Sequence, residues 1–221
     1  MARRSGRLCG LLLLVLGVVV QAACGAPEYS YVTNSEDRTY LRIPASWNAL
    51  DSKELGLAFG LDPTLDEDQG IWLAGYDADA SPSTAHLVGP HAAAPAVFVG
   101  VRDVPPPARG QISFDVMRDL FRPVSPAARQ RVAASLVSPF SGFVLIADEV
   151  VTTGEGLRGV HSIYRYRIQG GPTQVFDQTV YVNDDASKLY MFFVRCSTEC
   201  YEERRQEIES VVSSFTVRER P

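Results

Sequence analysis

Residues 143–195 read FVLIADEVVTTGEGLRGVHSIYRYRIQGGPTQVFDQTVYVNDDASKLYMFFVR and set the pattern for the rest of the chain. Apolar, β-branched and aromatic residues concentrate in four segments, at 143–152, 159–168, 173–183 and 188–195. The sequences between them contain Gly154-Glu155-Gly156, Gly170-Gly171-Pro172 and Asn183-Asp184-Asp185, which tolerate turn dihedrals. A parallel crossover needs roughly a dozen or more residues, so strands connected this closely must be antiparallel. The stretch predicts a four-stranded meander.

Three further strands are expected before the meander. Residues 39–43 alternate between apolar and polar side chains and end at Pro44, where Ala45-Ser46-Trp47 starts a turn or short helix. Residues 71–76 and 96–104 are the second and third strands, the third nearly continuous in apolar character and therefore central. The intervening segments, 51–69 and 77–95, are predicted as long loops, and Pro105–Pro107 as an extended exit from the third strand.

Helices are predicted both before and after the meander in the sequence. Ser113 caps a first helix and Ser125 with Pro126 opens a second, which ends near Leu136. Ser197 or Thr198 caps a closing helix whose apolar residues recur at helical spacing and must lie on the sheet: Ile208, Val211, Val212 and Phe215. The fold class is α+β, an antiparallel meander sheet with helices packed against it.

The first 23 residues read as a secretory signal rather than as part of this fold. Leu8–Val20 is apolar, too short for a permanent membrane span of about 20 residues, and a basic start precedes it with Arg3, Arg4 and Arg7. The small residues before Cys24 resemble the lipobox of bacterial lipoproteins, although Gln21 stands where Leu, Val or Ile is usual. That resemblance implies diacylglycerol on Cys24, a tether over 24–37 and one domain over 38–217. The alternative is ordinary secretion with cleavage after Ala22.

Net charge bears on the class of partner, and the cysteine count bears on disulfide formation. The formal charge is −5 and becomes −8 once the three signal arginines are removed, so a nucleic-acid partner is not expected. Cys9 leaves with the signal and Cys24 takes the lipid, which leaves Cys196 and Cys200 in an oxidising setting. Their spacing of four permits a disulfide; the alternative is a redox-active pair, whose usual motif is C-x-x-C.

Three parts of the chain resemble the PsbP/Mog1-like fold, in particular actinobacterial lipoproteins of the LpqN type. These parts are Ile43-Pro44-Ala45-Ser46-Trp47, the late meander, and Glu207–Val217 at the end of the closing helix. The resemblance implies an α/β/α sandwich and a non-enzymatic module that binds proteins or assists assembly of a complex. It carries no catalytic residues and no cofactor.

The residues themselves give little support for catalysis. G-x-S-x-G, S-x-x-K and H-E-x-x-H are absent from the sequence. His86 and His91 are interpreted as exposed loop residues, and His161 as a hydrogen-bonded structural residue on a strand. The acidic run Asp62, Asp66, Glu67, Asp68 departs from the EF-hand spacing and favours a solvated loop over a calcium site.

The sequence therefore predicts a lipid-anchored binding module at the outer face of the bacterial cytoplasmic membrane, with an envelope or membrane protein as partner. The predicted contact patch joins Trp72 and Tyr76 with the acidic residues Asp66 and Asp68, because aromatic anchors supply interface energy and charges steer encounter. A carrier of a small apolar ligand or lipid, and a hydrolase of unrecognised type, are the alternatives.

Overall fold

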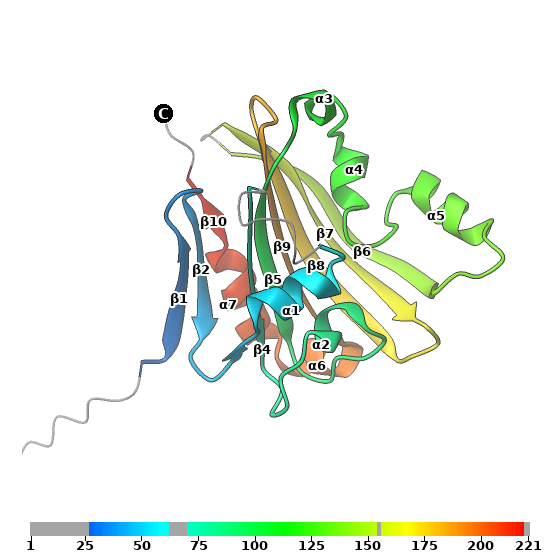
Figure 1. Ribbon diagram of the computed structural model, residues 1–221. Helices are drawn as coiled ribbons and strands as arrows, with labels where there is room; N and C mark the ends of the chain where they lie inside the picture. Colours follow the sequence, from blue (N-terminus) through cyan, green and yellow to red (C-terminus); the bar gives the residue numbers. More distant parts are fainter. Residues whose placement is uncertain (1–26, 62–69, 154–155, 219–221) are drawn as a thin grey trace, which may run out of the picture.

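A seven-stranded antiparallel sheet forms the centre of the domain (Figure 1). The structure is a computed structural model and describes residues 27–61, 70–153 and 156–218. The strand order is β3-β4-β5-β9-β8-β7-β6. The bounds are β3 Asn48–Ala49, β4 Ile71–Asp77, β5 Ala96–Asp103, β6 Phe140–Thr152, β7 Leu157–Ile168, β8 Thr173–Asn183 and β9 Lys188–Ser197. The predicted meander is confirmed, since β6, β7, β8 and β9 pair in chain order.

A second, three-stranded sheet lies on one face of the first. It has the order β1-β2-β10, with β1 Tyr29–Asn34, β2 Thr39–Pro44 and β10 Thr216–Val217. The prediction of a tether over 24–37 is wrong at 29–34, where β1 pairs with β2 along its whole length. Burial of Val32 and Asn34 holds β1 on the domain, which the polar local sequence did not indicate.

Helices cover both faces of the large sheet (Figure 1). On the same face as the small sheet lie α6 Thr198–Glu203 and α7 Arg205–Ser214. The buried Ile208 and Val211 of α7 belong to one hydrophobic cluster with Trp47. The opposite cluster contains Leu55, Leu87 and Met117, contributed by three different short helices. The helices on that side are α1 Ser52–Ala58, α2 Ala85–Val88, α3 Pro106–Arg109, α4 Phe114–Arg118 and α5 Pro126–Ala133. The α+β class is confirmed, with a small sheet added to one outer layer.

Three local predictions need correction. Residues 52–58, predicted as loop, form α1, because the Asp51 side chain accepts from the backbone N–H groups of residues 53 and 54 and caps the helix. The triple proline does not stay extended, since Pro106 takes the first helical position of α3, where its fixed φ is compatible with a helix. The single closing helix is two helices, divided at Arg204.

The predicted serine caps are confirmed at α4, α5 and α6. The side chains of Ser113, Ser125 and Ser197 each accept a hydrogen bond from a backbone N–H in the first turn. Among the described residues, no helix has the length and apolar content needed to cross a membrane.

Candidate functional site

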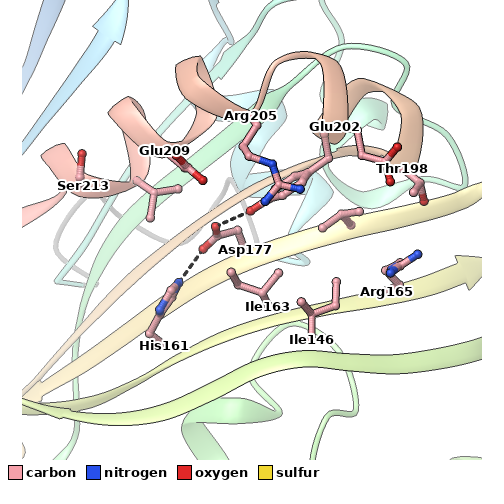
Figure 2. Close-up of a pocket in the computed structure, with 13 residues that line it drawn as sticks. Ile146, His161, Ile163, Arg165, Asp177, Thr198, Glu202, Arg205, Glu209 and Ser213 are labelled. Atoms are coloured by element: carbon pink, nitrogen blue, oxygen red, sulfur yellow. Dashed lines mark hydrogen bonds and ion pairs between the residues drawn. The ribbon is translucent and has the colours of Figure 1, made fainter.

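An open groove lies between the closing helices and the outer strands of the meander. Its volume is about 440 Å³. The apolar side chains that line it are Ile146, Ile163 and Val175 on β6, β7 and β8, and Val212 on α7. Figure 2 shows Glu202, Arg205 and Glu209 on the helices facing Ile146, Ile163 and Arg165 on the strands. The groove therefore combines an apolar floor with charged sides.

Strand alternation produces the floor. On β7, the half-buried His161, Ile163 and Arg165 point to the groove, while Tyr164 between them is fully buried in the opposite cluster. Period-two side-chain direction thus gives β7 one face for the core and one for the groove. Helix α6 contacts β8 and β9 and α7 contacts β9, whereas Ile146 on β6 is 48% exposed and Ile163 on β7 is half-buried on this face.

One end of the groove holds a hydrogen-bonded network around His161. Its Nδ1 lies 2.9 Å from Glu149 Oε1, and its Nε2 lies 2.8 Å from Asp177 Oδ1. The Tyr201 hydroxyl donates to Asp177 Oδ2 at 2.9 Å (Figure 2). Both ring nitrogens thus face carboxylates, so both donate. The hydrogen bond to Asp177 raises the pKa of His161 from 6.5 to about 9, which makes the ring an imidazolium at neutral pH.

The protonation and hydrogen bonding of His161 determine whether it could act as a general base. A general base needs a ring nitrogen with a free lone pair near the proton it removes. The two His161 nitrogens are occupied by Glu149 and Asp177, and no hydroxyl or thiol of a described residue is hydrogen-bonded to either. The arrangement is a charge network that fixes β6, β7, β8 and α6 to one another. The interpretation of His161 as a hydrogen-bonded structural residue is confirmed.

Four other charged side chains line the groove without a hydrogen-bonded or oppositely charged partner among the described residues. The charged side chains of Arg165, Arg205, Glu202 and Glu209 line the groove, and no side chain of a described residue forms a hydrogen bond or ion pair with their charged groups. The Arg165 Nε is itself buried without an acceptor. Arg205 contacts the ring of Tyr201, with its guanidinium carbon 5.9 Å from the centroid. Charges of both signs are therefore available to a bound partner.

The sequence-predicted patch lies elsewhere. Trp72 and Tyr76 on β4 are half-buried and pack against the cluster that contains Trp47. Asp66 and Asp68 lie outside the described residues, as does the acidic run considered for calcium. The patch as a contact surface stays a prediction.

The loop at 77–95 is more tightly held than the sequence indicated. His86 Nδ1 lies 2.7 Å from Oδ2 of the fully buried Asp77, so His86 is hydrogen-bonded and half-buried and not merely exposed. Leu87 and Ala92 are both fully buried. The described residues contain no group of three or more His, Cys, Asp or Glu side chains placed to hold a metal ion.

Cys196 and Cys200 form the predicted disulfide. Their α carbons are 5.9 Å apart, and the bond joins the end of β9 to the first turn of α6, next to the groove. Both cysteines are buried.

Removing this disulfide should have a modest effect, because the loop that it closes is short. Chain entropy for a closure of about five residues gives roughly 2 kcal/mol, less than the roughly 3 kcal/mol of a fifteen-residue loop. Urea unfolding of the Cys196→Ala/Cys200→Ala double variant should show a loss of that size against wild type. Two free thiols in alkylated, unreduced protein would contradict the assignment.

The fold and the groove define an α+β sandwich whose closing helices leave two meander strands open. No family model matches the sequence, and no curated protein matches it. Among solved structures, the chain is similar to cyanobacterial PsbP from Synechocystis, with 13% identity, a TM-score of 0.51, and coverage of 88% of this chain and 95% of that one. The predicted PsbP/Mog1-like fold is confirmed.

Two weaker similarities accompany it. The Saccharomyces cerevisiae Ran-binding protein Mog1p has 8% identity and a TM-score of 0.44, with 86% of this chain and 96% of that one covered. A Pseudomonas aeruginosa protein described as a putative regulator has 14% identity and a TM-score of 0.40, with 88% and 99% covered. At these identities the likeness concerns the fold.

Proposed function

We propose that the chain is a lipid-anchored, extracytoplasmic binding module of the LpqN type, which binds an envelope or membrane protein through the groove between α6–α7 and β6–β7. The observation that carries the proposal is the groove itself, with its apolar floor and four charges that no described residue pairs. Interfaces combine an apolar centre with a charged or polar rim in this way. The module has no catalytic role in this proposal.

Two features favour a protein partner over a carried lipid or a hydrolysed substrate. The groove is open along β6, where Ile146 is 48% exposed, so it would leave much of an acyl chain in water. The one histidine in it is held between two carboxylates. The Mog1p structure is described as that of a Ran-binding protein, a precedent for protein binding on a similar fold.

Site-specific photo-cross-linking in intact cells tests the proposal. A photoreactive residue in place of the exposed Glu209, on the groove side of α7, should give a discrete cross-linked protein that mass spectrometry identifies. The same residue in place of Glu54, exposed on α1 across the sheet, should not. Arg205→Glu should abolish the Glu209 cross-link, because it reverses an unpaired groove charge. Arg131→Glu, an exposed arginine of α5, should leave it intact. Equal capture from both positions would contradict the proposal.

Lipidation of Cys24 is the second testable part. Cys24 lies outside the described residues, and the proposal rests on the basic start, the apolar run and the small residues before it. Cys24→Ser should move the protein to the soluble fraction or leave it unprocessed. Only Gly25 to Glu28 separate Cys24 from β1, so a lipidated domain would sit within roughly 17 Å of the membrane surface. An unmodified mature N-terminus at Ala23 would contradict lipidation.

A further inference from the structure

The outer edge of β6 exposes several apolar side chains on a strand at the end of the sheet. β6 is thirteen residues long, ends the large sheet, and has β7 as its described neighbour. Val144, Leu145, Ile146 and Val150 are each 47–50% exposed. A long edge strand with exposed apolar side chains is a template for pairing with another strand. The groove described above is also open on this side and has one helical wall.

The side chains of residues 144–149 on β6 are distributed over the two faces of the sheet in a symmetric order. Val144 and Glu149 pair with Arg165 and His161, so they lie on the groove face. Leu145 and Asp148 pair with Tyr164 and Ser162, on the opposite face. The register shift between Leu145 and Ala147 breaks the alternation, which leaves Ile146 and Ala147 both on the groove face. Read in either direction, residues 144–149 give the same order of faces: groove, opposite, groove, groove, opposite, groove.

Such a pattern suits an isologous contact. Residues directly opposite each other in an antiparallel pair share a face of the sheet. When β6 meets β6 of a second copy, Val144 faces Glu149, Leu145 faces Asp148 and Ile146 faces Ala147, and every pair matches. A shift of two residues in either direction sets Ile146 or Ala147 against a residue of the opposite face. A strand with uninterrupted alternation could not match this irregularity, whereas a second copy does.

The charges agree with the same register. A patch that contacts itself needs both signs, because a patch of one sign repels its copy. Arg165 lies beside Val144 on β7, and in this register Val144 faces Glu149 of the second copy. This register therefore brings the Glu149 carboxylate of the second copy, which is 65% exposed in the single chain and bonded to His161 through one oxygen, to the position next to Val144 and so near Arg165.

We propose that the domain forms a two-fold symmetric dimer through antiparallel pairing of the β6 edges, with the axis between Ile146 and Ala147. The dimer completes the groove, since the second copy supplies the missing wall with its own closing helices. The floor is then a continuous sheet and the two walls are helical, a trough for an extended segment of a partner protein. This inference rests on the proposed function for its ligand, but the dimer itself does not.

Cysteine pairing between two full-length copies tests the register. A tagged Val144→Cys copy and a differently tagged Glu149→Cys copy, expressed together, should form an intermolecular disulfide under mild oxidation. Two Val144→Cys copies, or two Glu149→Cys copies, should not, because each pair would be offset by five residues, about 17 Å along the strand. Disulfides need α carbons within about 7 Å. Ile146→Lys should abolish the cross-link, while Leu57→Lys, which alters a comparably exposed leucine on α1, should preserve it.

Sedimentation velocity of the purified full chain gives the second measurement. Wild type and Leu57→Lys should sediment as dimers and Ile146→Lys as a monomer. Cross-links of equal strength in the same-residue combinations would overturn the register. A monomeric wild type without a cross-link would overturn the dimer. If that monomer still gave the Glu209 photo-cross-link, the proposed function would stand and the dimer would be overturned.

Discussion

Asp177→Asn is expected to lower the free energy of unfolding at pH 7 by about 3 kcal/mol, because it breaks a buried ion pair from one side. The Asp177 side chain is 4% exposed and accepts from both His161 and Tyr201. Asparagine cannot balance the imidazolium, which keeps only Glu149, a residue 65% exposed. Urea unfolding followed by tryptophan fluorescence measures the change. Asp115→Asn, which removes an exposed carboxylate paired with Arg118, should cost less than about 1 kcal/mol.

The pH dependence distinguishes this network from ordinary packing. The pKa of His161 is raised from 6.5 to about 9, so folding favours the protonated ring. Its contribution to stability is complete below pH 6.5, declines as the pH rises, and is lost above about 9. After allowance for partial solvent exposure, this contribution is on the order of 2 kcal/mol. The difference between wild type and Asp177→Asn should therefore shrink between pH 6.5 and 9.5. A constant difference across that range would assign the effect to packing.

The meander could be predicted from the sequence because its strands and turns depend on residues that are close together in the chain. Strand β8 was predicted with its exact observed bounds, 173–183, and the caps Ser113 and Ser125 were identified from their positions before apolar periods. Alternation, turn residues and caps require no knowledge of distant contacts. The closing helix was located in the same way, but the apolar pattern of the sequence did not show that it divides at Arg204.

Features that depend on distant contacts were missed. β1 has little apolar content, and it is a strand because β2 pairs with it. The groove requires the β7–β8 register, which sets His161 opposite Thr179 and so brings Asp177 within reach diagonally, together with the packing of α6 that supplies Tyr201. One signal was present in the sequence: His161, Ile163 and Arg165 alternate with core residues, which marks a strand face not fully covered by helices.

Arg195 shows why the segment 77–95 is part of the core rather than a removable loop. The residue is fully buried on β9. Its guanidinium donates to the backbone carbonyl oxygens of Leu87 and Gly89, at 3.1 and 2.8 Å, and to Gln174 Oε1 at 2.9 Å. Burial lowers the pKa of Arg195 to about 9, so this contact is made against a desolvation cost. The cost is offset because the last carbonyls of α2 would otherwise be buried without donors.

Arg195→Ala should therefore destabilise the protein by about 4 kcal/mol, since it leaves a cavity and removes the guanidinium donor from the Leu87 and Gly89 carbonyl oxygens, while Gln174 Oε1 keeps its hydrogen bond from the Ala92 N–H. Arg195→Met fills most of the volume and removes the buried charge, so its loss should be smaller, about 2 kcal/mol, and should isolate the cost of the orphaned acceptors. Urea unfolding measures both, with Arg131→Ala on exposed α5 as the control. Hydrogen exchange at the amides of residues 85–92 should accelerate in both Arg195 variants, because α2 loses its tie to β9. Unchanged exchange there would contradict the role of Arg195 in holding the segment.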